Sequence, residues 1–240
     1  MKAMLFAAGL GTRLKPFTDA APKALAVVGD KTLLELNIRY LHKAGIDEII
    51  VNVHHFAGMI ENFLDDNDGF GSNITISDET EQVLETGGGL KKAAYFFEGD
   101  QQFVVMNVDV LTNLDLPAMI NAHRATASVA TLAVMKRDSS RQLLFNNDMQ
   151  LCGWRNKVTG EEKTAIAASE TSEYAFSGIQ ILSNKIWQNE DFEGKFSLID
   201  LYLNAAKTNK ITGYNHTGDT FIDVGKPESI ELARKMLTGV

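Results

Sequence analysis

The sequence predicts a Rossmann-like α/β fold, in which a mainly parallel mixed sheet carries helices on both faces. The first observation is that the strands are continuous apolar runs, such as Lys2–Ala8 ended by Gly9, which is typical of strands buried on both faces. The second is that these runs alternate with segments whose apolar residues recur at helical spacing. Parallel strands need a long crossover, usually a helix, so the alternation favours this fold class.

The N-terminal part of the chain supplies this alternation. Leu34, Ile38 and Leu41 lie on one helical face, and Gly45 ends that helix, which begins near Leu33. The remaining elements follow from the spacing and length of their apolar runs. Strands are predicted at 48–53, 73–76 and 103–106, and helices at 56–64 and 90–97.

The pattern changes after about residue 126, where strands follow one another without helices between them. Residues 153–172 are polar and predict a loop-rich segment. Pro227 suits the first turn of a final helix. Strands are predicted at 128–135, 142–145, 174–182, 210–214 and 220–225, and helices at 197–207 and 228–237. No repeat or low-complexity linker interrupts the chain, so a single domain spanning 1–240 is expected.

Composition excludes several classes of protein. The 240 residues carry a net charge of −8, and 45% of them are apolar, which is ordinary for a globular chain. The acidic balance argues against nucleic acid as a partner, because non-specific binding needs a surface rich in Lys and Arg. No apolar run is long enough to span a membrane, and the single Cys152 cannot form an internal disulfide. We therefore expect a cytoplasmic protein.

The turn after the first strand is the richest segment for chemistry. Gly9 and Gly11 are expected to adopt positive φ and to let the backbone approach a ligand, so that free N–H groups can surround phosphate oxygens. Arg13 and Lys23 add two cations, which suits a triphosphate. The segment is not a Walker A loop, and it lacks the third glycine of a dinucleotide fingerprint. A two-glycine turn alone can also be purely structural.

Two aspartates follow apolar strands that are far apart in the chain. Asp109 comes after the 103–106 strand, and Asp223 lies in the last strand. Carboxylates at such strand ends point into the crevice where α/β sheets bind ligands. Mg²⁺ prefers one or two carboxylates together with phosphate oxygens and water, so the pair predicts a Mg²⁺ site. Each aspartate taken alone could equally be a turn or helix-capping residue.

The opening motif resembles the sugar-phosphate nucleotidyltransferases, which join a sugar 1-phosphate to a nucleoside triphosphate and release pyrophosphate. The motif reads Ala-Ala-Gly-x-Gly-Thr-Arg-Leu-x-Pro-x-Thr and is followed by Pro-Lys-x-Leu, at 7–18 and 22–25. The resemblance implies that Arg13, Lys23 and Asp109 serve catalysis and that Asp109 and Asp223 hold the metal. It implies that the triphosphate is bound by Ala8, Gly9, Gly11, Thr12, Arg13 and Lys23. The family usually has glycine before this aspartate, whereas this chain has Val108, which could alter the local backbone.

Three consecutive glycines open the helix predicted at 90–97, and their cost in chain entropy implies that something approaches closely. Within the family, Glu-Thr-Gly-Gly-Gly at 85–89 most resembles the N-acetylmuramate α-1-phosphate uridylyltransferases of peptidoglycan recycling. The resemblance implies that Gly87 and Gly88 contact the nucleobase and that Ser177 and Gly178 lie beside the sugar. Glu162 and Lys163 resemble a sugar-binding pair, although a solvated charge pair is the commoner explanation.

These expectations define partners and alternatives. The partners would be a nucleoside triphosphate, chiefly UTP, and a sugar 1-phosphate, in a monomer or small homo-oligomer without membrane or nucleic acid. Residues of about 1–126 would bind the nucleotide, about 127–225 the sugar phosphate, and 226–240 would form the closing helix. The alternatives are a thymidylyl- or uridylyltransferase for glucose 1-phosphate, a cytidylyltransferase for phosphocholine, and a non-catalytic regulatory domain that binds a nucleotide.

Overall fold

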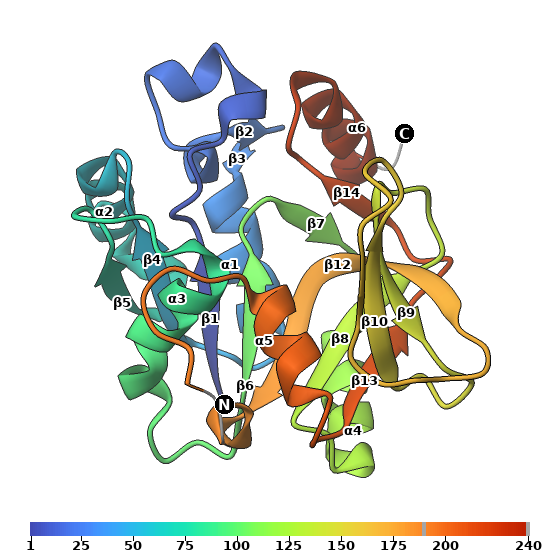
Figure 1. Cartoon of the computed structure of the whole chain (residues 1–240). Helices are drawn as coiled ribbons and strands as arrows, with labels where there is room; N and C mark the ends of the chain where they lie inside the picture. Colours follow the sequence, from blue (N-terminus) through green and yellow to red (C-terminus); the bar gives the residue numbers. More distant parts are fainter. Residues whose placement is uncertain (189–190, 239–240) are drawn as a thin grey trace.

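A mixed sheet, ten-stranded within the described residues, forms the centre of the computed structural model, which describes residues 1–188 and 191–238 (Figure 1). Its main path runs β11-β10-β9-β12-β6-β1-β4-β5, while β8 pairs with β12 and β13 pairs with β8. The strands are β1 (Lys2–Phe6), β4 (Glu48–Val53), β5 (Asn73–Asp78), β6 (Gln102–Asn107), β8 (Ala130–Met135), β9 (Arg141–Phe145), β10 (Leu151–Asn156), β11 (Glu162–Thr164), β12 (Ser172–Ser183) and β13 (Ile211–Asn215).

The sheet is parallel on one side of β12 and mainly antiparallel on the other. Strands β5, β4, β1 and β6 are all parallel, whereas β12 runs antiparallel to β6, β8 and β9. Because β12 has 12 residues, it pairs with β6 near its end and with β9 near its start. One long strand therefore joins the N-terminal region (1–126) to the C-terminal region (127–238).

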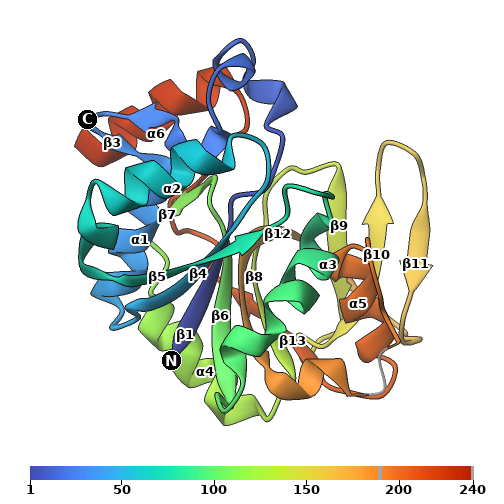
Figure 2. The ribbon, with the colours of Figure 1, turned by 90° about the vertical axis from the view of Figure 1, so that its left-hand side faces the viewer.

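Helices cover both faces of the parallel part, because alternate side chains of each strand point to opposite faces. In β1, Ala3 and Leu5 pack into the core beneath α1 (Leu33–Lys43), α2 (Ala57–Asp65) and α4 (Leu116–Thr126). Met4 packs into the opposite core with α3 (Glu85–Lys92) and α5 (Leu198–Ala205). Figure 2 shows these two helical layers on either side of the sheet and the β10–β11 hairpin projecting from it.

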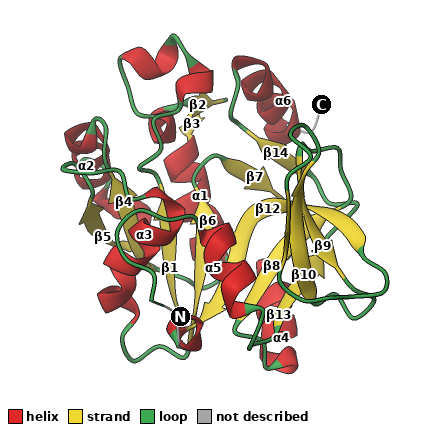
Figure 3. Cartoon of the chain, viewed as in Figure 1, coloured by secondary structure: helices red, strands yellow, loops and turns green. Residues whose placement is uncertain are grey.

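Two small sheets and the last helix close one end of the molecule. Strand β2 (Val27–Val28) pairs with β3 (Lys31–Thr32), and β7 (Val110–Thr112) pairs with β14 (Phe221–Asp223). Helix α6 (Pro227–Thr238) packs against both β2 and β14. Buried Leu14, Leu111 and Val224 belong to the apolar cluster at this end. Figure 3 shows β7 and β14 between α6 and β12.

The fold class predicted from the sequence is confirmed, and the elements depart from it in a few places. The loop-rich prediction for 153–172 holds for residues 157–161 and 165–171, but the segment also contains most of β10, all of β11 and the first residue of β12. The helix at 90–97 begins earlier, at Glu85, and ends as a 3₁₀ turn. Helix α4 and the short strands β2, β3 and β7 were not predicted from the sequence. Residues 239 and 240 of the predicted closing segment lie outside the described residues.

No helix in the described part of the chain is both long and apolar enough to cross a bilayer.

Candidate active site

A cavity of about 310 Å³ opens at the carboxyl ends of β1 and β6. This edge is where parallel α/β sheets bind ligands, because the loops that follow the strands diverge there. Its walls come from the glycine-rich turn, the ends of β4 and β6 and the start of α3. The lining residues are Phe6, Ala7, Ala8, Gly9, Gly11, Thr12, Arg13, Lys23, Asn52, Glu79, Val83, Glu85, Thr86, Asn107, Val108, Asp109 and Gly225.

Gly9 and Gly11 have different structural roles in the turn. Gly11 has φ of 60°, and a Cβ there would lie 2.8 Å from the Thr18 methyl group and 3.0 Å from Lys23 Cβ. Gly9 has ordinary φ, so the expected positive φ is confirmed at Gly11 and wrong at Gly9. A Cβ at Gly9 would meet nothing within 4 Å. The turn therefore depends on Gly11 for its shape, whereas Gly9 leaves open space beside the backbone.

Lys23 and Asp109 form a direct ion pair at the floor of the cavity. The Lys23 side chain is only 10% exposed, and such a buried ammonium is destabilising unless an anion lies beside it. Val108, which replaces the usual glycine, keeps an ordinary φ and is buried. Its N–H donates to Phe6 O, and its carbonyl accepts from Asn37 Nδ2 at 2.8 Å. The backbone around Asp109 is thus fixed without a glycine.

Backbone pairing between β7 and β14 brings the two distant aspartates together. Asp223 lies opposite Val110, and Val224 N–H donates to Asp109 O at 2.8 Å. Arg13 Nη2 lies 3.9 Å from Asp223 Oδ2, with both side chains about half exposed. Gly225 lines the cavity, and a Cβ there would meet Arg13 Nη2 at 2.7 Å. Arg13, Lys23 and Asp109 therefore line the cavity, and Asp223 lies outside its lining but within 3.9 Å of Arg13.

Two buried polar residues, absent from the expectations above, connect the glycine-rich turn to α3. Asn52 Oδ1 accepts from the N–H groups of Ala7 and Ala8, at 2.7 and 3.3 Å. Asn52 Nδ2 donates to Glu79 Oε1 at 2.7 Å, and Glu79 Oε2 accepts from Leu84 N–H at 3.3 Å. Asn52 and Glu79 are 2% and 1% exposed, and both line the cavity. We call this connection the Asn52–Glu79 brace.

The brace was detectable in the sequence only as a weak signal. Asn52 is the polar residue within the apolar core of the strand Glu48–Val53, and a polar residue in such a strand usually has a buried partner. Its partner lies 27 residues further on, so no local pattern connects them.

The glycines of α3 are close-packed against the chain itself. A Cβ at Gly87 would lie 2.3 Å from the Phe196 ring, and one at Gly88 would lie 2.1 Å from Gly194 O. The N–H groups of both glycines donate to Phe196 O, at 2.9 and 3.3 Å. The close approach inferred from the glycine run is confirmed, and the neighbour is the segment that leads into α5. Val83, Glu85 and Thr86 are the residues near this helix start that line the cavity.

Ser177 and Gly178 lie at an irregularity in β12, where its register against β8 shifts between Phe176 and Gln180. Gly178 has φ of 71°, and a Cβ there would lie 2.9 Å from the amide of Asn107, which lines the cavity. Ser177 is 1% exposed, and its hydroxyl lies 2.7 Å from His216 Nε2. Burial lowers the pKa of His216, which favours the neutral ring. Gly178 therefore allows β12 to reach the edge of the cavity.

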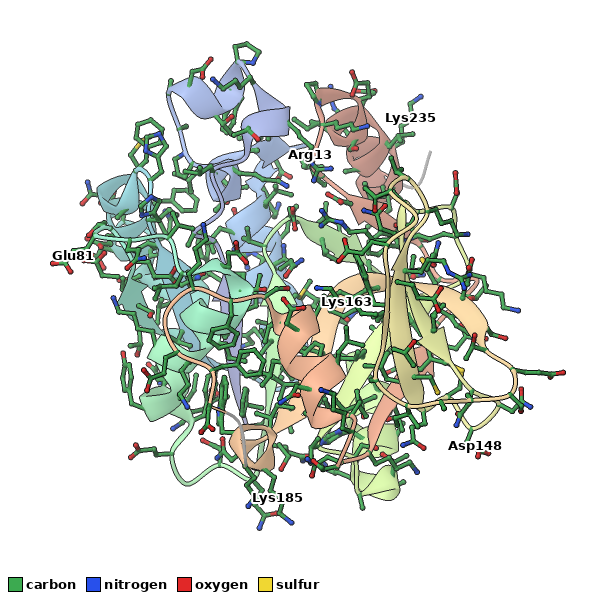
Figure 4. All side chains as sticks on the ribbon, viewed as in Figure 1. Arg13, Glu81, Asp148, Lys163, Lys185 and Lys235 are labelled. Atoms are coloured by element: carbon green, nitrogen blue, oxygen red, sulfur yellow. The ribbon has the colours of Figure 1, made fainter. Side chains whose placement is uncertain are left out.

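Glu162 and Lys163 lie on β11, outside the lining of the cavity. Glu162 accepts from Arg155, and Lys163 Nζ donates to Asp200 Oδ1 of α5 at 2.8 Å. Both side chains are at least 40% exposed. Figure 4 shows Lys163 near the upper end of α5 and Arg13 higher up, near α6. The structure thus places the pair in surface ion pairs between the β10–β11 hairpin and its neighbours.

The architecture and the cluster of cations and carboxylates define a class of enzymes that handle nucleoside phosphates. The sequence profile of the Nucleotidyl transferase family matches residues 2–238. The chain belongs to this family, which confirms the predicted family and the predicted enzyme class. Membership also favours the enzyme over the non-catalytic regulatory domain.

Individual relatives and a solved structure are similar to this chain over nearly its whole length. The chain is 30% identical to the N-acetylmuramate alpha-1-phosphate uridylyltransferase of Neisseria meningitidis, over 94% of this chain and 93% of that protein. It is 29% identical to the D-glycero-alpha-D-manno-heptose 1-phosphate guanylyltransferase of Aneurinibacillus thermoaerophilus, over 99% and 98%. The crystal structure of HddC from Yersinia pseudotuberculosis complexed with GMP-PN is 26% identical, with a TM-score of 0.79 over 98% and 99% of the two chains.

Proposed function

We propose that this protein transfers a uridylyl group from UTP to N-acetylmuramic acid 1-phosphate, giving UDP-N-acetylmuramic acid and pyrophosphate. One observation supports the reaction type: Arg13, Lys23 and Asp109 line one cavity beside the glycine-rich turn, and the pairing of β14 with β7 brings Asp223 next to them. The similarity to the uridylyltransferase of Neisseria meningitidis supports this base and this sugar.

The chemical step is an in-line substitution at the α-phosphorus. An oxygen of the sugar 1-phosphate forms the new P–O bond, and the bond to the bridging oxygen of pyrophosphate breaks. Pyrophosphate leaves with that electron pair. Because the attacking oxygen is already anionic, no general base is needed, and the barrier consists mainly of charge repulsion and positioning.

The residues of the cavity can both reduce the charge repulsion and position the phosphates. Lys23 supplies a nearly buried positive charge, and Arg13 supplies an exposed one at the mouth. The open backbone at Gly9, together with Gly11 and Thr12, would receive phosphate oxygens at this turn. In this proposal Ala8 lies in the nucleotide subsite, and Gly87 and Gly88 shape that subsite from outside the lining by packing against Phe196 and Gly194. Glu162, Lys163, Ser177 and Gly178 would belong to a sugar subsite that extends beyond the described cavity.

The donor set at Asp109 and Asp223 fits a Mg²⁺ ion. Backbone pairing brings these two aspartates close together, and one or two carboxylates are what Mg²⁺ takes from proteins, with phosphate oxygens and water completing its shell. Among the described residues, no group of three or more His, Cys, Asp or Glu side chains could hold a metal ion. When bound, the ion supplies positive charge to the phosphates. Asp109 and Asp223 would hold it.

A second candidate is guanylyl transfer to a heptose 1-phosphate. It is favoured by the relative from Aneurinibacillus thermoaerophilus, which matches nearly the whole chain, and by the similarity to a nucleotidyltransferase-fold structure complexed with GMP-PN. The glycines of α3 are buried against Phe196 and Gly194, so they do not themselves discriminate between the bases.

The test is a pyrophosphate-release assay with Mg²⁺ that crosses four triphosphates with a panel of acceptors. UTP, GTP, dTTP and CTP would be combined with the 1-phosphates of N-acetylmuramic acid, N-acetylglucosamine, glucose, mannose and a heptose, and with phosphocholine. We expect the largest kcat/KM for UTP with N-acetylmuramic acid 1-phosphate. A maximum for GTP with the heptose phosphate would move the assignment to the second candidate. Silence across the grid would contradict both.

A further inference from the structure

One cation close to the aspartate pair has no part in the function described so far. Arg137 follows β8 and is partly buried. Its Nη2 donates to Phe176 O at 2.8 Å, while its Nε is buried without a hydrogen-bond partner. The guanidinium lies 4.6 Å from the centre of the Phe221 ring. A guanidinium can donate several hydrogen bonds in one plane, and that of Arg137 donates one within the described part of the chain.

The charge of Arg137 is also unmatched by protein. No carboxylate of the described residues lies within 4.0 Å of it, although Asp223 is near enough to oppose the lowering of its pKa by burial. Other basic residues of the C-terminal region are already paired: Arg155, Lys157 and Lys163 each have a carboxylate within 2.8 Å. A partly desolvated cation without a counter-ion is costly, and an anionic ligand would remove that cost.

The position of Arg137 indicates which ligand this is. Phe221 and Asp223 lie two residues apart on β14, so their side chains share one face of that strand. The ring beneath the guanidinium therefore lies on the same side as a member of the aspartate pair. The carbonyl that Arg137 holds belongs to Phe176, next to Ser177 and Gly178. Arg137, although outside the lining of the cavity, thus contacts both the strand that carries Asp223 and the strand assigned to the sugar.

We propose that Arg137 binds an anionic group of the acceptor sugar, either its 1-phosphate or a carboxylate carried by an acidic sugar. The inference rests on the proposed function, since it presupposes a sugar phosphate as acceptor. Planar guanidinium donors match the paired oxygens of both groups, and such charge-assisted hydrogen bonds are among the strongest in proteins.

The experiment compares Arg137→Met and Arg137→Lys with the native enzyme, using Lys136→Met as the matched control. Lys136 is the neighbouring cation, and it is exposed. The acceptors are N-acetylmuramic acid 1-phosphate and N-acetylglucosamine 1-phosphate, which differ by one lactyl carboxylate. KM is measured for the acceptor and for the triphosphate, and acceptor binding is measured by calorimetry, which needs no turnover.

We expect Arg137→Met to raise the acceptor KM about tenfold or more, with the triphosphate KM within twofold of native. A rise for both acceptors identifies the 1-phosphate as the bound group, and a rise only for the muramic acid compound identifies the carboxylate. Arg137→Lys, which keeps the charge and loses the planar fork, should give a smaller rise, and Lys136→Met none.

The proposal is overturned if Arg137→Met keeps the native KM and affinity for both acceptors. It is also overturned if the KM for the triphosphate rises as much as the KM for the acceptor. If Arg137→Met fails to fold, Arg137→Lys is used instead, and its KM and affinity for the acceptors and its KM for the triphosphate decide in the same way. A native enzyme that is silent in the assay contradicts the proposed function, and calorimetry with the native and variant proteins still tests Arg137 separately. Native protein that binds neither acceptor contradicts the Arg137 proposal as well.

Discussion

The polar contacts around the glycine-rich turn and those of the β10–β11 hairpin differ in burial. In the N-terminal region, the Lys23–Asp109 pair and the Asn52–Glu79 brace are largely buried, and they join loops that follow separate strands. In the C-terminal region, the pairs of Glu162 and Lys163 are exposed, on a projecting hairpin. Buried polar contacts fix a single geometry because breaking them leaves an unsatisfied group, whereas exposed pairs contribute little. The contacts around the glycine-rich turn are thus rigidly fixed, whereas the pairs of the β10–β11 hairpin can change at little cost in stability.

The largest effect is expected at Asp109, which forms the buried ion pair with Lys23. Asp109→Asn removes the counter-ion of Lys23 and one proposed metal ligand, so we expect kcat to fall by about 10² to 10³, which is about 2.7–4 kcal/mol. Steady-state kinetics with Mg²⁺ checks this, with Asp148→Asn as a control on the exposed surface. Asp223→Asn should lose a similar factor. Near-native turnover in either variant would show that the pair is dispensable.

The next effect concerns His123 of α4, a buried contact between the two regions. Its Nδ1 lies 2.8 Å from Thr131 Oγ1 of β8, and burial lowers its pKa to about 4. The unfolded chain, with a pKa near 6.5, therefore binds the proton first as pH falls. This contribution to the free energy of unfolding is full above about pH 6.5 and is lost as pH falls towards 4, by about 3 kcal/mol.

Urea unfolding at a series of pH values measures this loss, and His123→Gln should flatten the curve between pH 6.5 and 4. An equally steep curve in that variant would assign the pH dependence to other groups.

The brace is expected to have an intermediate effect, which a reciprocal exchange can isolate. Asn52→Asp places two carboxylates face to face, and Glu79→Gln turns an amide donor towards Leu84 N–H or Asn52 Nδ2. Each should raise the triphosphate KM about tenfold, roughly 1.4 kcal/mol. The double variant restores a donor opposite an acceptor at every position, so its KM should return to within about threefold of native. Additive losses in the double variant would contradict a direct link.

The smallest effect is expected at Lys163, whose ion pairs on the β10–β11 hairpin are exposed. Lys163→Met should change the free energy of unfolding by less than about 1 kcal/mol, because exposed ion pairs contribute little. Urea unfolding tests this, with Lys157→Met as a second exposed cation. A loss of more than about 2 kcal/mol in the free energy of unfolding would show that the exposed pairs of the hairpin also stabilise the fold. If stability is unchanged, any rise in acceptor KM reports contact of Lys163 with the sugar phosphate.

The same contrast explains what could be predicted from the sequence. Gly11, Lys23 and Asp109 were identified because their local motif, or the strand before them, fixes where they lie. The β10–β11 hairpin was missed because its strand residues include Arg155, Asn156 and Glu162, so the alternation that marks a strand is obscured.

Other omissions have different causes. Helix α4 carried usable signals: Asp115 caps it by accepting from Ala118 N–H, and a proline lies in its first turn. Glu79 and Arg137 could not be identified because their importance depends on burial and on partners distant in the chain.

The pairing of β14 with β7 also bears on the order in which the protein is made. The glycine-rich turn, the brace and Lys23 with Asp109 all lie within the first 109 residues, so they leave the ribosome early. Asp223 and its strand follow much later in the chain. Since domains form as the chain emerges, a chain that has not yet reached β14 lacks one of the two proposed metal ligands. In the proposed function, activity therefore waits until β14 has been made and has paired with β7.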